Sequence, residues 1–172
     1  MTISGWKGRR RGFSLVEILI VVVILGILAA IAIPKFASAS SVSRENALKE
    51  NLRLFRTQIG VYRVQHGDVF PGYPGDDSTQ TATEAAFISQ MTEYTDNSGN
   101  VSASQGAPYT NGPYWSQTPL NTVGNLSSVK MLAAGDTFTA DGTTGWLYQP
   151  ATGKVEPNQL GADSTGTNYT DY

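Results

Sequence analysis

The sequence predicts an α+β fold, in which a long N-terminal helix, with a membrane half and an amphipathic half, packs on a small antiparallel β-sheet domain with long loops. Three observations support this prediction. Sixteen consecutive residues, Ile18 to Ile33, carry no polar side chain. Residues 35–66 then repeat apolar side chains at helical spacing. Residues 67–172 hold 13 of the 18 glycines and 7 of the 8 prolines, which favours short strands and loops.

The composition of the 172-residue chain excludes several kinds of site. No cysteine is present, which rules out disulfide scaffolds, cysteine-ligated zinc, iron–sulfur clusters and a thiol nucleophile. A single histidine argues against a multi-histidine metal site. Four bases and no acid fall in residues 1–12, six bases and three acids in 13–66, and two bases and eleven acids in 67–172. We therefore expect a basic leader, a mildly basic middle and an acidic remainder.

The first element is a membrane-spanning helix. The 21 residues from Phe13 to Ile33 are interrupted only by Ser14 and Glu17, and as a helix they extend about 30 Å, the thickness of a bilayer core. The bases Lys7, Arg9, Arg10 and Arg11 precede the span. By the positive-inside tendency they predict a single-pass membrane protein with a cytoplasmic N-terminus and the residues after Lys35 translocated.

Three interpretations of this segment compete: a permanent anchor, a secretory signal, and a filament-forming helix. Arg10 to Leu15 resembles a twin-arginine signal, and Ala37 to Ala39 fits an A-x-A cleavage site, which would release an exported soluble domain after Ala39. Glu17 argues against the signal, because an ionised side chain inside an apolar run is costly and a signal sequence has no use for it.

The residues Gly12 to Glu17 (GFSLVE), placed after a basic leader and before the apolar run, resemble the class III signal of type IV pilins and type II secretion pseudopilins. The resemblance implies that a prepilin peptidase removes residues 1–12 by cutting between Gly12 and Phe13, and that it methylates the new Phe13 amine. It also implies a transmembrane helix over residues 13–34 and a helix-bending role for Pro34.

Cleavage would give Glu17 a partner. The new amine at Phe13 is cationic, and a neighbouring subunit in a helical filament could place that amine beside Glu17. Such a pair would replace two isolated buried charges, each of which is prohibitive in an apolar core. The hypothesis is that Glu17 selects correct docking during assembly. The expected partners are copies of this chain and related pilins, the prepilin peptidase, an inner-membrane assembly platform and, before assembly, the membrane.

Residues 35–66 are expected to continue the helix to about Gln65. One face carries an apolar stripe at spacings of 4, 3, 4 and 3: Leu48, Leu52, Phe55, Ile59 and Tyr62. Basic residues occupy the other faces. The stripe predicts a helix that docks one side on the remainder of the chain.

Residues 67–172 predict a loop-rich acidic domain. Thr83 to Tyr94 favours a short helix capped by Thr83. Gly145 to Pro150, a turn, and Lys154 to Pro157 predict a hairpin that covers the apolar stripe, and Leu126 to Leu132 is a further candidate strand. The tail Gly161 to Tyr172 lacks apolar periodicity and is expected to be mobile or a loop. The hairpin resembles the globular part of major pseudopilins.

The sequence offers little chemistry. It contains no Walker loop, G-x-S-x-G or paired-carboxylate pattern, so we expect no enzyme and no cofactor. His66, at the helix end, predicts a capping or solvated role. Because some pseudopilins bind calcium in their C-terminal loops, weak calcium candidates are Asp136, Asp141, Asp163 and Asp171. No nucleic-acid partner is expected, since the four leading bases fit membrane orientation.

The sequence therefore predicts a structural subunit of a type IV pilus-like filament. Two uses remain open: a pseudopilus of a type II secretion system, or a surface type IV pilus for adhesion, motility or DNA uptake. Adhesive pilins commonly carry a C-terminal disulfide. The absence of cysteine favours the secretion type.

Overall fold

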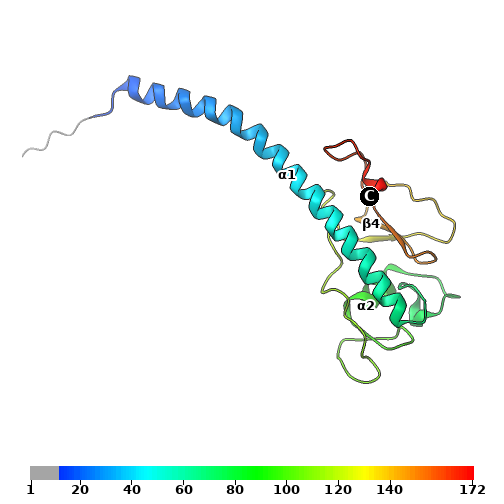
Figure 1. Cartoon of the computed structure of the whole chain (residues 1–172). Coiled ribbons are helices and arrows are strands. Elements are labelled where there is room, and N and C mark those ends of the chain that lie inside the picture. Colours follow the sequence, from blue (N-terminus) through cyan, green and yellow to red (C-terminus); the bar gives the residue numbers. More distant parts are fainter. Residues whose placement is uncertain (1–11) are drawn as a thin grey trace, which may run out of the picture. The chain divides into compact units, whose positions relative to one another are not determined.

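The computed structural model describes residues 12–172. The chain forms two units, of which the first ends at Ser40 and the second comprises Ser41–Tyr172. Helix α1 spans Leu15–Gln65 and contributes residues to both units (Figure 1). The four leader bases Lys7, Arg9, Arg10 and Arg11 lie outside the described residues, so their role in orientation stays a prediction.

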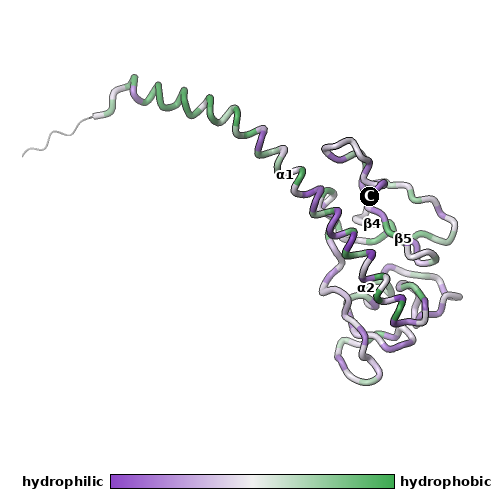
Figure 2. Tube along the Cα trace, in the orientation of Figure 1, coloured by the Kyte–Doolittle hydropathy of each residue, from purple (hydrophilic) through white to green (hydrophobic). Residues whose placement is uncertain are grey.

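The first unit is the apolar part of α1. Among the described residues, α1 is the one helix long and apolar enough to cross a membrane. Figure 2 shows that hydrophobic residues predominate along this part of the helix. Pro34 lies inside α1, where the Ser38 hydroxyl donates a hydrogen bond to the Pro34 carbonyl at 3.0 Å.

The second unit is built around the remainder of α1. The predicted stripe of Leu48, Leu52, Phe55, Ile59 and Tyr62 is buried, with 0–2% of each residue exposed. The helix ends at Gln65, as predicted. Helix α2 (Glu84–Thr92) starts at Thr83, whose hydroxyl accepts a hydrogen bond from the Ala86 backbone N–H at 3.1 Å, so the predicted cap is also confirmed.

A three-stranded sheet packs against α1. Strands β4 (Trp146–Gln149) and β5 (Lys154–Pro157) form the predicted antiparallel hairpin. Strand β3 (Val129–Met131) pairs parallel to β4, so the sheet is mixed rather than wholly antiparallel. The reason is that residues 132–145 form a crossover loop between β3 and β4 instead of a tight turn. The α+β class is confirmed.

Shorter elements complete the unit. Strands β1 (Tyr94–Thr95) and β2 (Val101–Ser102) form a separate two-stranded sheet. Two short 3-10 helices are η1 (Pro74–Asp76) and η2 (Tyr169–Asp171).

The core centres on Phe55 of α1. The Phe55 ring centroid lies 5.8 Å from that of Phe87, 4.9 Å from that of Trp115 and 5.1 Å from that of Trp146. The Trp146 indole N–H donates to the Pro119 carbonyl at 2.7 Å. Aromatic rings from α1, α2, β4 and the loop before β3 therefore meet at one point, and the polar atom of Trp146 is satisfied there.

The tail after β5 is a loop, as one of the two expectations had it, but it is held in place. The carboxylate of Asp163 forms an ion pair with Lys49 of α1 at 3.0 Å. The Ser164 hydroxyl donates to Glu45 of α1 at 2.6 Å. The tail is thus attached to α1 by polar contacts, which leave no periodic signal in a sequence.

We expect Phe55→Ala to lower the free energy of unfolding of the full chain by about 3–5 kcal/mol, because it removes a ring with no exposed surface and leaves a cavity. The measurement is urea unfolding in detergent, followed by tryptophan fluorescence. Leu54→Ala is the matched control: Leu54 is the preceding residue of α1 but is 41% exposed, so its loss should cost less than about 1 kcal/mol. Equal losses for the two variants would contradict this account of the core.

Candidate functional site

The start of α1 has a defined local structure. The Ser14 hydroxyl accepts hydrogen bonds from the backbone N–H groups of Val16 (3.2 Å) and Glu17 (3.4 Å). In return, a carboxylate oxygen of Glu17 accepts a hydrogen bond from the Ser14 backbone N–H at 3.2 Å. This reciprocal arrangement is a capping box, which satisfies N–H groups that have no partner within the helix.

Ser14 is the residue that the sequence prediction missed. Its signal was the spacing of a serine three residues before a glutamate at the start of an apolar run. The capping box fixes the first residue of α1 and holds Glu17 beside the peptide that follows Phe13. An acidic group in the first turn also interacts favourably with the positive end of the helix dipole.

The predicted cleavage position is open to an approaching protein. Phe13 is 80% exposed. Within residues 12–172, a Cβ atom added to Gly12 would meet no heavy atom within 4 Å. The bond between Gly12 and Phe13 is therefore accessible to another protein. The carboxylate of Glu17 lies nearby, in the first turn of α1.

The other end of α1 carries a buried polar cluster around His66. This histidine is 2% exposed, so the expected solvated role is wrong. Its Nδ1 lies 2.8 Å from the Tyr62 carbonyl, which can only accept, so Nδ1 carries a proton. Its Nε2 lies 3.0 Å from the Thr95 hydroxyl. Its ring stacks on that of Tyr62, with 3.8 Å between the two ring centroids. Because the Nδ1–H satisfies a carbonyl of the last turn of α1, the capping alternative is confirmed, and the buried ring also packs at the helix end.

Asp76 shares this cluster. The Tyr62 hydroxyl donates to Asp76 Oδ1 at 2.6 Å, while Asp76 Oδ2 is buried without a hydrogen-bond partner. Burial raises the pKa of the Asp76 carboxyl above its usual range, and the hydrogen bond from Tyr62 offsets part of that rise. The charges of His66 and Asp96 act on it in opposite directions. The ionised carboxylate therefore opposes folding at neutral pH.

The four aspartates proposed as calcium candidates are separately engaged with protein donors. Asp141 accepts from Lys130 and Asn158, both at 2.7 Å, and Asp163 from Lys49 and Tyr172. Asp136 accepts from the Ala133 N–H and Asp171 from Asn168. Hydrogen bonds, chiefly those from Lys130 and Thr165 respectively, lower the pKa of Asp141 and of Asp163. Across residues 12–172, no cluster of three histidine or acidic side chains could hold a metal ion.

We expect Asp76→Asn to stabilise the chain increasingly as pH rises from 3 to 7. Because the folded state raises the pKa of Asp76 above the unfolded value of about 3.9, its contribution to stability is present at low pH and is lost as pH rises through the folded pKa. Asparagine does not titrate there and keeps an oxygen for Tyr62. Denaturant midpoints measured across this pH range provide the check.

The adjacent Asp77 is the matched control. Hydrogen bonds from Thr79 lower the pKa of Asp77, so its contribution to stability is gained as pH rises. Asp77→Asn should therefore show the opposite pH trend. A difference between Asp76→Asn and wild type that does not vary with pH would contradict the assignment.

The start of the chain matches a known protein family. Residues 7–33 match the family described as the prokaryotic N-terminal methylation motif. The chain is 47% identical over 57 residues to the type IV major pilin protein PilA of Myxococcus xanthus, covering 33% of this chain and 26% of that protein. No solved structure is significantly similar to it.

Two further relatives extend beyond the first helix. The type IV major fimbrial protein FimA of Dichelobacter nodosus is 32% identical over 58% of this chain and 74% of its own length. The type II secretion system core protein G of Pseudomonas aeruginosa is 36% identical over 46% of this chain and 51% of its own length. These names describe pilus and secretion-system components, and they confirm the prediction that the chain is not an enzyme. The chain belongs to the family of type IV pilins and pseudopilins.

Proposed function

We propose that this chain is a structural subunit of a type IV pilus-like filament, and specifically a pseudopilin of a type II secretion system. The observation that carries the proposal is the apolar surface of α1, where the large side chains from Leu15 to Phe36 are 49–83% exposed. Such a surface does not stay in contact with water. Lipid covers it before assembly, and the same helix of other copies covers it in the filament.

Maturation begins with the leader. A prepilin peptidase removes residues 1–12 and methylates Phe13. Residues 13–34 hold the chain in the inner membrane with its N-terminus in the cytoplasm. Residues 35–66 and the acidic residues 67–172 are translocated, and an assembly platform extracts the subunit. The exposure of Phe13 and the open surroundings of Gly12 support this step.

Assembly then depends on Glu17. One oxygen of its carboxylate accepts the Ser14 N–H, and a carboxylate can accept several hydrogen bonds. Glu17 can therefore keep the capping box while it pairs with the cationic Phe13 amine of a neighbouring copy. An unpaired carboxylate in the apolar filament core would cost several kcal/mol. The charge thus selects the copies that dock in register.

The choice between secretion and a surface pilus rests on different observations. The absence of cysteine and the similarity to the P. aeruginosa secretion protein support a pseudopilin. The longer match to the D. nodosus fimbrial protein supports the second candidate, a surface pilus.

We expect the mature chain purified from its host to begin at an N-methylated Phe13. Edman sequencing and intact-mass measurement would detect this end. Replacement of Gly12 by a bulky residue, Gly12→Val, should block processing because the peptidase must approach the bond closely, while Ala39→Val should have no effect. A mature chain beginning at Ser40 would contradict the proposal and identify an exported soluble domain instead.

We expect Glu17→Gln to be processed normally but to lower the yield of sheared filaments at least about tenfold, because it removes the charge that pairs with the amine. Glutamine retains a side-chain oxygen for the Ser14 N–H. Ser14→Ala is the converse control, which weakens the capping box and keeps the charge, and should assemble better than Glu17→Gln. Equal assembly of Glu17→Gln and wild type would contradict the role of Glu17.

A strain that carries Glu17→Gln also distinguishes the two candidate functions of the filament, secretion and a surface pilus. If the chain is a pseudopilin, Glu17→Gln should leave folded secreted proteins in the periplasm and change no surface-filament phenotype. Loss of surface filaments with normal secretion would instead support the surface pilus.

A further inference from the structure

Positive charge in the second unit is concentrated on one face of α1. Lys49, Arg53 and Arg56 are spaced at i, i+4 and i+7, so their side chains share a face. Residues 67–172 carry only two bases, Lys130 and Lys154, against eleven acids. Both lysines form ion pairs within that region, with Asp141 (2.7 Å) and Glu156 (2.5 Å) respectively. The cationic face of α1 therefore stands out from an acidic surround.

The same three cations border a groove of about 350 Å³, which we call the cationic groove. Its lining residues are Lys49, Leu52, Arg53, Arg56, Thr57 and Tyr172. Leu52 and the ring of Tyr172 are its apolar components, and the Lys49 ammonium lies 4.4 Å from the centroid of that ring. An apolar surface bordered by cations fits a short segment that carries a carboxylate.

The three cations are unequally compensated. Lys49 is paired with the buried carboxylate of Asp163 at 3.0 Å. The Arg56 guanidinium donates to the backbone oxygens of Val155 (3.1 Å) and Tyr172 (2.8 Å), which fixes its position. Burial lowers the pKa of Arg56, while the charge of Glu156 counteracts that effect.

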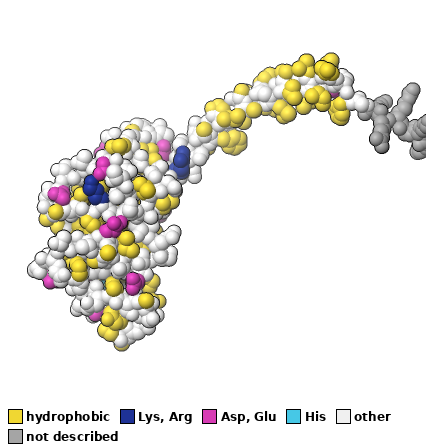
Figure 3. Space-filling view, turned by 180° about the vertical axis from the view of Figure 1, so that it is seen from behind, with side chains coloured by type: hydrophobic (Ala, Val, Ile, Leu, Met, Phe, Trp, Pro, Cys, Tyr) yellow, Lys and Arg dark blue, Asp and Glu magenta, His cyan; other side chains and the backbone are white. Residues whose placement is uncertain are grey.

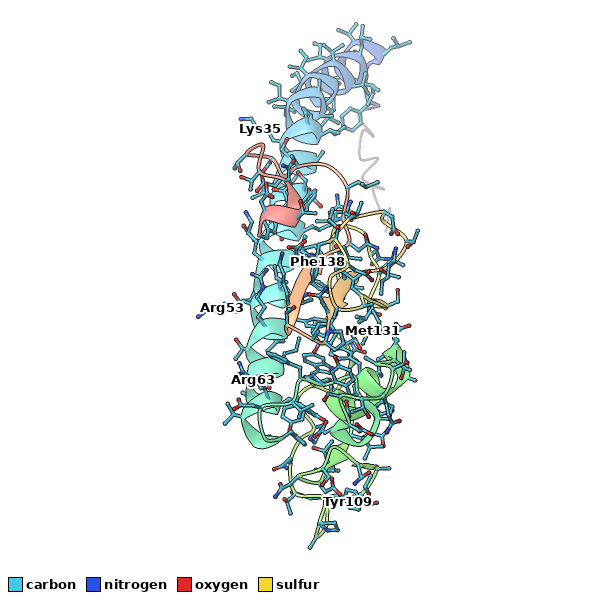
Figure 4. The ribbon with its side chains drawn as sticks, turned by 90° about the vertical axis from the view of Figure 1, so that its right-hand side faces the viewer. Lys35, Arg53, Arg63, Tyr109, Met131 and Phe138 are labelled. Carbon is cyan, nitrogen blue, oxygen red and sulfur yellow. The ribbon has the colours of Figure 1, made fainter. Side chains whose placement is uncertain are left out.

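Arg53 is the most weakly compensated of the three. It reaches Glu50 at 4.0 Å, and the two side chains are 80% and 74% exposed. A pair of this kind contributes little. Figure 4 shows Arg53 projecting outward from α1. Arg53 is therefore the cation of the groove that is most available to an anion from outside the chain.

We propose that the cationic groove receives an acidic loop from a second copy of this chain. The inference rests on the proposed filament, which places copies side by side. Charge complementarity selects the occupant, because acidic side chains are scattered over the visible face of the second unit (Figure 3) and a second copy carries the same acidic side chains. Among the exposed carboxylates, Asp77 lies directly after η1 and Asp136 lies in the loop between β3 and β4. The contact would add an electrostatic lock outside the apolar core of the filament.

The cysteine-free chain allows a direct test by disulfide cross-linking. Thr57→Cys marks the groove, and Ser78→Cys and Thr137→Cys mark the loops of Asp77 and Asp136. Filaments made from Thr57→Cys mixed with one loop variant should give oxidised dimers in at least one combination. Adding Arg53→Glu should lower the dimer yield at least about threefold, and Asp77→Lys or Asp136→Lys on the partner copy should restore it.

Arg63→Glu is the matched control, because it makes the same charge change on α1 outside the groove, where Arg63 pairs with Asp68 at 3.1 Å. It should leave the dimer yield unchanged. If wild-type filaments form but neither combination cross-links, or Arg53→Glu has no effect, the groove contact is wrong and the filament stands. If the wild-type chain forms no filament, the proposed function is wrong, and the groove contact that rests on it is wrong as well.

A membrane surface is the competing occupant, and it has its own readout. Full chain in detergent is mixed with vesicles of phosphatidylcholine containing phosphatidylglycerol. Arg53→Glu should not change vesicle binding relative to Arg63→Glu. A selective loss of binding by Arg53→Glu, without cross-links in filaments, would assign the groove to anionic headgroups and overturn the proposal.

Discussion

The buried stripe of α1 is the contact on which the second unit is built. Phe55 touches aromatic rings from α2, from β4 and from the loop that carries Trp115. Tyr62, one end of the stripe, stacks on His66 and donates to Asp76. A sheet of three short strands and one short helix would have little stability on their own. A rigid helix supplies the common surface that makes these short elements cooperative.

The same helices also protect the edges of the sheet. A sheet of three short strands presents unpaired backbone groups on both outer strands, which invite pairing with other chains. Glu84 of α2 accepts the Val129 N–H of β3 at 2.7 Å. Arg56 of α1 donates to the Val155 carbonyl of β5 at 3.1 Å. Charged side chains thus bind a backbone group on each edge strand, which opposes strand addition by another chain.

Local patterns predicted the parts of the structure that depend on neighbours in sequence. The end of α1, the Thr83 cap and the β4–β5 hairpin all follow from spacing or turn residues within a short window. The parallel pairing of β3 with β4, the burial of His66 and the attachment of Asp163 to Lys49 join residues far apart. Polar contacts of this kind have no period, so a single sequence does not reveal them. At the start of α1 the resemblance drew attention to Glu17, while the capping role of Ser14 was readable in the spacing and was overlooked.

The position of Glu17 within the first turn allows its carboxylate both to cap the helix and to reach a cationic partner. The first N–H groups of a helix lack intrahelical acceptors, and in lipid or in a filament core water does not supply them. A carboxylate three residues after the capping serine reaches back to one of these groups. In the proposed filament, the Phe13 amine of a neighbouring copy would approach this same end, where the positive end of the helix dipole also lies. A glutamate nearer the N-terminus would precede the helix, and one further along would be buried away from both positive charges. The capping geometry therefore places the single acidic charge of the apolar segment where a cation can reach it.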